Sequence, residues 1–125
     1  MSNFQFYSVI PNYAVETTFL VRIDPQIERA EELLNALYYG LWFPGYFGFN
    51  WNALYDCLSD LSWLPTKVAV VYHQVLPGLE AKDLKMYLDI LQEASANTSK
   101  SLDIKFVAAF HGDVRIDVEK LLATD

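Results

Sequence analysis

An expected helix at about residues 51–61 carries the residues best suited to chemistry. Its apolar face is formed by Ala53, Leu54, Cys57, Leu58 and Leu61. The opposite face carries Asn52, Tyr55, Asp56 and Ser59, at i, i+3, i+4 and i+7. A ring beside a carboxylate on a rigid helix suits protein recognition, because the ring supplies contact area and the carboxylate accepts a bidentate arginine. A solvated helix face with one incidental tyrosine explains the same pattern, so these residues alone leave both interpretations open.

Other residues could suggest catalysis, metal binding or phosphate binding, but their spacing argues against each. Cys57, His73 and His111 match no nucleophile signature and make a poor zinc set. We expect a buried Cys57 thiol and two histidines that are solvated or cap an element at a strand end. Gly45 and Gly48 lack the Gly-Lys-Ser/Thr ending of a phosphate loop, so we expect positive φ or close packing there. The sequence predicts no enzyme, no cofactor and no metal site.

Composition narrows the class of partner. The chain has 125 residues, with 9 Lys and Arg against 16 Asp and Glu, and a formal net charge of −7. This acidity argues against direct binding of nucleic acid or an anionic membrane and suits a basic protein. The single cysteine and an N-terminus unlike a secretory signal favour the cytoplasm. The length predicts one domain over residues 1–125.

The elements that must position these residues alternate between strands and helices. Strands are expected at 17–23, 66–72 and 102–110, and helices at 51–61 and 81–96. A further helix is expected to begin at Asp24-Pro25, with Asp24 as its N-cap, and to end near Gly40. This order predicts an α/β fold with a three-stranded, mostly parallel sheet. Alternation at residues 4–8 and 114–118 is compatible with an extra edge strand at each end.

The segment Phe43-Pro-Gly-Tyr-Phe-Gly-Phe-Asn-Trp-Asn-Ala-Leu-Tyr-Asp-Cys-Leu58 resembles the barstar family of intracellular ribonuclease inhibitors. The shared pattern is Pro-x-Tyr-aromatic-Gly-x-Asn, followed by a helix of the form Asp/Asn-Ala-Leu-aromatic-Asp-Cys-Leu. The element order fits the same family over about residues 18–110. The resemblance implies a three-stranded parallel sheet with helices packed against it.

The resemblance also implies roles for individual residues. Asp56 corresponds to the carboxylate that takes the place of the scissile phosphate in the nuclease, and Tyr46 to a tyrosine that stacks in its cleft. Asn50, Tyr55 and Glu93 match further contact positions. The sequence departs from the founding inhibitor at four positions: Asn52 replaces an aspartate, Asp60 a glycine, Leu61 a tryptophan and Asn97 a glutamate. The partner is therefore expected to be a nuclease other than barnase or a nuclease toxin.

The leading hypothesis is a bacterial, cytoplasmic inhibitor or immunity protein, of the kind found in toxin–antitoxin systems. It would bind a basic ribonuclease or nuclease toxin through Tyr46, Asn50, Asn52, Tyr55, Asp56, Ser59, Asp60 and Glu93. One alternative is a scaffold module that kept the fold without the nuclease target. The other is a small α/β enzyme that uses a pocket between Tyr46 and Asp56, although the sequence offers no complete catalytic set.

Overall fold

The chain forms a parallel four-stranded sheet with helices packed on one face. The structure is a computed structural model, which describes residues 4–9, 17–98 and 103–123. The strands are β1 (Gln5–Tyr7), β2 (Thr18–Ile23), β3 (Val68–His73) and β4 (Lys105–His111). They lie in the order β1-β4-β3-β2, and every neighbouring pair is parallel. The expected α/β fold is confirmed, with a sheet of four strands instead of three.

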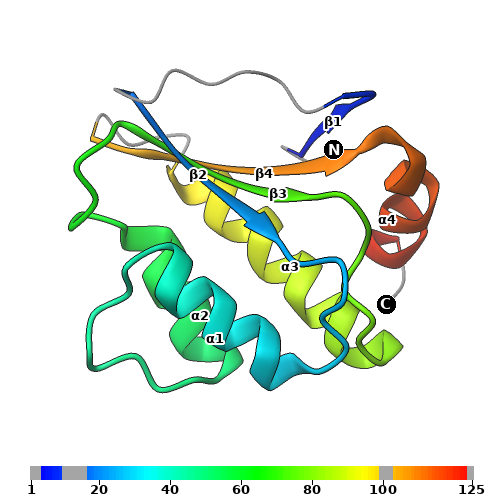
Figure 1. Ribbon diagram of the computed structural model, residues 1–125, viewed down its shortest axis with the longest axis horizontal. Helices are drawn as coiled ribbons and strands as arrows, with labels where there is room; N and C mark the ends of the chain where they lie inside the picture. The colour runs from blue at the N-terminus through cyan, green and yellow to red at the C-terminus, as the bar shows by residue number, and fades with distance from the viewer. Residues whose placement is uncertain (1–3, 10–16, 99–102, 124–125) are drawn as a thin grey trace.

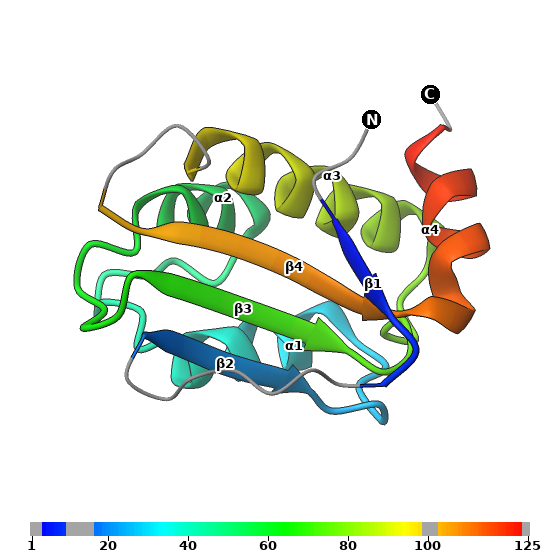
Figure 2. The same ribbon diagram turned by 90° about the horizontal axis from the view of Figure 1, so that it is seen from above.

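The helices are α1 (Ala30–Gly40), α2 (Trp51–Asp60), α3 (Ala81–Thr98) and α4 (Arg115–Leu122), and the short 3-10 helix η1 (Gly112–Val114) precedes α4. The first three helices lie together beneath the sheet, whereas α4 stands at the end where β4 finishes (Figure 1). Seen from above, the sheet lies over the same three helices (Figure 2). No helix among the described residues is long and apolar enough to cross a membrane.

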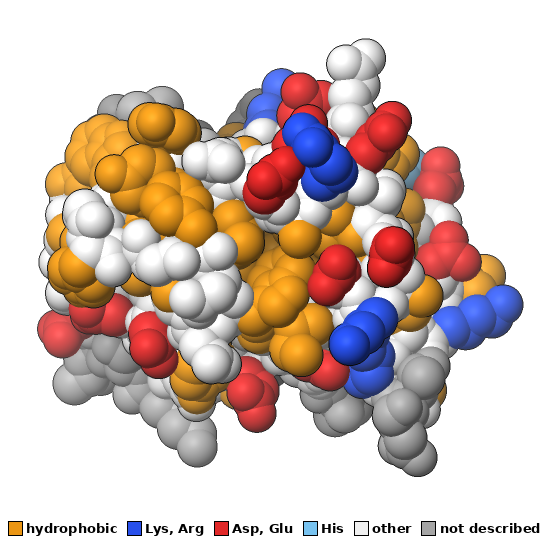
Figure 3. Space-filling view, turned by 90° about the horizontal axis from the view of Figure 1, so that it is seen from below, with side chains coloured by type: hydrophobic (Ala, Val, Ile, Leu, Met, Phe, Trp, Pro, Cys, Tyr) orange, Lys and Arg blue, Asp and Glu red, His pale blue; other side chains and the backbone are white. Residues whose placement is uncertain are grey.

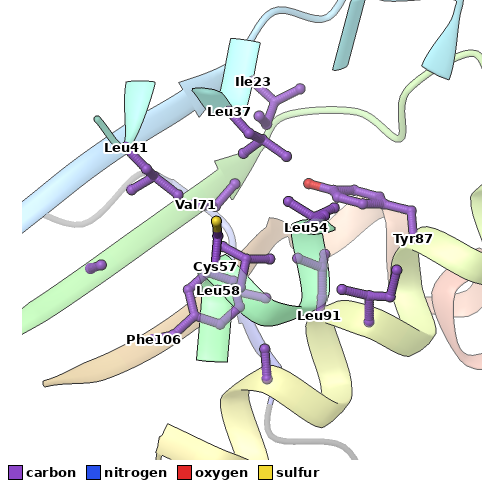
Figure 4. Packing of buried hydrophobic residues seen from close by; sticks show 14 of the residues in the cluster. Ile23, Leu37, Leu41, Leu54, Cys57, Leu58, Val71, Tyr87, Leu91 and Phe106 are labelled. Atoms are coloured by element: carbon purple, nitrogen blue, oxygen red, sulfur yellow. The ribbon is translucent and has the colours of Figure 1, made fainter. Parts of the chain in front are cut away.

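The core lies between the sheet and the three helices, and α2 sits at its centre. Leu54, Cys57 and Leu58 of α2 are buried, as the spacing predicted. In Figure 4 they lie among side chains of the sheet, such as Val71 and Phe106, and of α3, such as Tyr87 and Leu91. Because one side of α2 is packed in this way, the direction of its opposite side is fixed.

The start of α1 differs from the sequence prediction. Asp24 does not cap α1: its side chain accepts from the Gln26 N–H at 2.9 Å in a separate turn, and α1 begins only after Arg29. Glu32 supplies the cap, because its carboxylate accepts from the Arg29 N–H at 3.1 Å.

At the chain ends, β1 is the extra N-terminal strand that alternation allowed. The expected C-terminal edge strand is wrong, since residues 114–118 belong to η1 and α4. Leu102, where the expected last strand begins, lies outside the described residues.

Backbone strain occurs at large residues in the described part of the chain and not at glycines. Trp42, Phe49 and Leu61 have φ of 56°, 53° and 53°, whereas no described glycine has positive φ. The expectation of positive φ at Gly45 and Gly48 is therefore wrong. A Cβ at Gly48 would come within 3.1 Å of the Asn50 side chain, which supports close packing, but a Cβ at Gly45 would meet nothing within 4 Å.

Candidate functional site

Asn50 joins the aromatic loop to the start of α2. Its backbone is extended, and its Oδ1 accepts from the Ala53 N–H at 2.8 Å, as an N-cap should. Its Nδ2 also donates to the Gly48 carbonyl oxygen at 3.3 Å. The predicted N-cap is confirmed. In the free chain this side chain holds the loop and the helix in a fixed relation, and thereby fixes where α2 presents its surface.

The exposed side of α2 presents a row of polar groups. Asn52, Asp56 and Asp60 are all exposed and follow one another at spacings of four residues. Asp60 also accepts from the Ser62 N–H at 3.3 Å, which supports the turn after the helix. The negative charges of Asp56 and Asp60 reach Cys57: burial, and then these two carboxylates, raise the pKa of its thiol to about 11. The expected buried, unreactive thiol fits this environment.

Tyr55 and Ser59 are less available than their helical positions suggested. Both are half-buried, because α3 packs alongside α2. Asn97 of α3 donates its Nδ2 to the Tyr55 hydroxyl at 2.9 Å and to Ser59 Oγ at 3.4 Å. An exposed Tyr55 was expected, and this part of the prediction is wrong. Asn97 therefore links α3 to two residues of α2 that stand 42 and 38 positions earlier in the sequence.

A groove of about 430 Å³ runs between α2 and α3. It is lined by Trp51, Asn52, Tyr55, Met86, Asp89, Ile90, Gln92 and Glu93. The groove thus brings three of the predicted site residues together, namely Asn52, Tyr55 and Glu93. Met86, Asp89, Ile90 and Glu93 stand at i, i+3, i+4 and i+7 on α3, on one face of the helix. This spacing was the available signal for the lining residues that sequence reasoning missed.

The two carboxylates at the groove differ in their surroundings. Asp89 is paired with Lys85, whose Nζ lies 2.9 and 3.0 Å from its two oxygens. Glu93 is exposed. A cation that approached the groove would therefore meet Glu93 as the more available charge, since Lys85 already balances Asp89.

The loop between α1 and α2 adds an aromatic surface beside this helix. Tyr46 is 76% exposed, whereas its neighbour Phe47 is buried against Phe43 with ring centroids 4.9 Å apart. Figure 3 shows hydrophobic side chains gathered over this loop, on the left of the helical face, with acidic side chains along their lower edge. Tyr46 and Asp56, both described, are not part of the groove lining.

The histidines occupy different environments. His73 is the last residue of β3, at the strand end as expected, but it is fully buried instead of solvated or capping. Its Nδ1 is 3.0 Å from the Ala109 carbonyl oxygen, and its Nε2 is 2.7 Å from the Tyr87 hydroxyl. Burial lowers the pKa of His73 to about 4. His111 does cap, because its Nδ1 accepts from the Asp113 N–H at 3.1 Å. Within the described ranges, no three His, Cys, Asp or Glu side chains gather into a group that could hold a metal ion.

The order of the elements and the parallel sheet define an α/β protein with helices packed against one face of the sheet. Residues 18–110 match the model of the family Barstar (barnase inhibitor). This match spans most of the chain, so the chain belongs to the barstar family, whose members are ribonuclease inhibitors and not enzymes. No curated protein gives a significant match to the chain.

Proposed function

We propose that this chain inhibits a basic ribonuclease or nuclease toxin by covering its active site with α2 and the loop before it. The observation that carries the proposal is the setting of Asp56. Its side chain is exposed on a helix whose opposite face is packed into the core through Leu54, Cys57 and Leu58. A carboxylate held in this way can receive the arginine and lysine groups that a ribonuclease uses to hold a phosphate.

The rigidity of α2 supports this role, because a group that is already ordered loses little freedom on binding. Asn50 caps the first turn of α2. Leu61 follows the last turn, and its fully buried side chain anchors that end of the helix in the core. The carboxylate of Asp56 would therefore reach the phosphate site without rearrangement of the helix.

The neighbouring residues would extend the contact. Tyr46 offers an exposed ring to stack in the cleft, and Glu93 offers a second charge across the groove. Tyr55, Ser59, Asn50, Asn52 and Asp60 would complete the surface around Asp56. The formal charge of −7 would attract a basic partner from a distance and speed its encounter.

We also propose where in the cell this inhibition takes place. A cell that makes a nuclease needs its inhibitor where its own RNA is, so we place the chain in the bacterial cytoplasm, as the immunity partner of a nuclease toxin. A nuclease encoded beside this chain, whose toxicity in a bacterial host is relieved when the chain is co-expressed, would support this setting. Unrelieved toxicity would count against it.

An inhibition assay tests the proposal. The parent chain, Asp56→Asn and Asp117→Asn are titrated against barnase and a panel of other basic ribonucleases, with RNA cleavage as the readout. Asp117 is an exposed carboxylate on α4, far from α2, so its variant removes the same charge elsewhere (Figure 1). We expect Asp56→Asn to weaken inhibition by about 2–5 kcal/mol, because the nuclease's cations are left buried without a partner, and Asp117→Asn to act like the parent. Failure of the parent to inhibit any ribonuclease would overturn the proposal in favour of a scaffold module.

A further inference from the structure

The loop before α2, together with the adjoining parts of α1 and α2, forms a stretch without charge. Residues 33–55 contain no Asp, Glu, Lys or Arg, in a chain that has 9 basic and 16 acidic residues. The stretch is bounded by Glu32 on one side and Asp56 on the other. Four of its aromatic side chains are exposed: Tyr39 (74%), Trp42 (58%), Tyr46 (76%) and Phe49 (43%). We call these four residues the aromatic patch. Figure 3 shows hydrophobic side chains gathered over the loop between α1 and α2, on the left of the helical face.

Three members of the aromatic patch, Tyr39, Trp42 and Phe49, are held by ring contacts. The Tyr38 ring lies 5.0 Å from the Tyr39 ring and 5.0 Å from the Phe49 ring, so it joins the two. The Trp42 ring packs edge-on against Phe19 of β2 at 4.8 Å. Rigid aromatic side chains lose little conformational freedom on binding, which is why they dominate protein interfaces.

Two members of the patch occupy strained backbone. Trp42 and Phe49 have φ of 56° and 53°, a region that costs a bulky residue roughly 1–2 kcal/mol and that glycine or asparagine would occupy more easily. At Trp42 the strain follows from the end of α1, where the Phe43 N–H donates to the Tyr38 carbonyl oxygen at 3.0 Å in a Schellman turn. Large apolar residues stand at both positions, and both leave much of their surface in solvent. Burial in the free chain therefore does not fully explain why large aromatic residues occupy these two strained positions.

The exposed area of the aromatic patch is large enough to form much of one side of an interface. If a full aromatic side chain exposes about 200 Å², the four exposed fractions amount to about 500 Å² of aromatic surface. This is more than half of the roughly 800 Å² that each partner contributes to an interface of standard size. The acidic side of α2 alone is a narrow row of polar side chains, so the patch can supply most of the apolar area that a tight complex requires.

We propose that the aromatic patch is a second docking surface for the same nuclease, and that Tyr39, Trp42 and Phe49 bind an uncharged, apolar part of the nuclease beside its basic active site. This inference rests on the proposed function and names what else the partner must present. Charge decides the occupant. A second copy of this chain would bring a net charge of −7 against another chain of net charge −7, whereas a basic nuclease brings the opposite charge.

Three variants test this surface. Trp42→Asn replaces the ring with a residue that tolerates left-handed backbone, and Tyr39→Gln removes an exposed ring from the end of α1. Ile116→Gln is the matched control, because Ile116 is 66% exposed on α4, away from the loop (Figure 1). Each variant is first checked for parent-like thermal unfolding. Its binding to barnase, or to the basic ribonuclease of the panel that the parent inhibits, is then measured by stopped-flow and dissociation kinetics.

We expect the Trp42→Asn and Tyr39→Gln variants each to bind at least about tenfold more weakly, with the loss in the dissociation rate. The loss should be the same at about 0.05 and about 0.5 M salt, because apolar contacts are not screened, whereas the loss from Asp56→Asn should shrink as salt rises. Ile116→Gln should bind like the parent.

The outcomes separate the two proposals. If Asp56→Asn weakens binding and both aromatic variants bind like the parent, the second docking surface is wrong and the proposed function stands. If no ribonuclease is inhibited, the proposed function fails and this inference fails with it. Sedimentation velocity of the free chain over about 10–300 μM tests whether a second copy of the chain occupies the patch instead. A dimer that Trp42→Asn abolishes would overturn the assignment of the patch to a nuclease.

Discussion

The turns that follow α1 and α2 place a large residue in the same backbone conformation and use it in opposite ways. Trp42 has φ of 56° and Leu61 has φ of 53°. The Leu61 side chain is fully buried in the core, whereas Trp42 is 58% exposed. After α2, the strained backbone directs a side chain into the core and fixes the helix that carries Asp56. After α1, it holds a ring at the surface, so equal backbone strain serves stability in one turn and, in our proposal, binding in the other.

Glycine substitution gives the largest expected difference between the two turns. Leu61→Gly removes a buried side chain, which costs about 2–5 kcal/mol, and regains roughly 1 kcal/mol of backbone strain. Its unfolding free energy in urea should fall by about 1–4 kcal/mol. Trp42→Gly regains similar strain and loses a ring contact worth about 0.5–1.5 kcal/mol, so it should stay within about 1 kcal/mol of the parent. Equal losses in the two variants would remove the distinction between these turns.

The free energy of unfolding should depend on pH through His73, which is buried in the core. His73 has its pKa lowered to about 4 in the folded chain because burial disfavours the imidazolium, whereas an unfolded histidine titrates near 6.5. Between these values the unfolded chain binds more protons, so the contribution of His73 to stability is present above about pH 6.5 and is lost as pH falls toward about 4. The full loss is on the order of 3 kcal/mol.

His73→Phe is the variant that isolates this effect, because it removes the titrating group. Urea unfolding of the parent and of His73→Phe should be compared from about pH 7 to about pH 4. The unfolding free energy of the parent should fall more steeply than that of the variant. Parallel pH profiles would show that His73 is not buried in its neutral form.

A smaller effect is expected from the link between α2 and α3. Asn97→Ala removes the hydrogen bonds to Tyr55 and Ser59, and should lower the unfolding free energy by about 0.5–1.5 kcal/mol. Asn35 is the matched control, since its Nδ2 donates at 2.9 Å to a carbonyl oxygen within α1. Asn35→Ala should leave stability unchanged or raise it slightly, because alanine favours helix. If the two variants behave alike, the link across the helices contributes nothing measurable.

Charge at the edge of the surface should affect the speed of association more than the strength of the complex. Association with a basic ribonuclease should slow as salt rises, because charges are screened beyond about 10 Å at 0.1 M. An Asp60→Asn, Glu93→Gln double variant should associate more slowly and depend less on salt. A stopped-flow series over salt for the parent and the double variant measures this, and an association rate independent of salt in the parent would contradict electrostatic steering.

The sequence predicted α2 and its surroundings well because the relevant signals are local. Helical spacing placed Leu54, Cys57 and Leu58 on the buried side and left Asp56 on the exposed side, and Asn50 was recognised as a cap from its type and position. These properties depend on neighbours within one or two turns.

The errors arose where a distant partner or a competing local bond decides the outcome. His73 ends β3, where a solvated histidine was expected, but the Ala109 carbonyl oxygen of β4 and the Tyr87 hydroxyl of α3 meet its two ring nitrogens and make its burial acceptable. Tyr55 lies on the polar face by spacing, but Asn97 covers its hydroxyl from α3. Asp24 has the right type for a helix cap but forms its own turn with Gln26, and Glu32 caps α1 instead.

The central claim is that Asp56 takes the place of a phosphate in a ribonuclease active site. The most direct test is competition between this chain and a ribonucleotide for barnase, or for the basic ribonuclease that the chain inhibits. Binding of the chain is followed at a series of nucleotide concentrations. The account predicts that the apparent Kd rises linearly with nucleotide concentration, since both ligands need the same cationic site. A Kd that does not change when the nucleotide saturates the enzyme would contradict it.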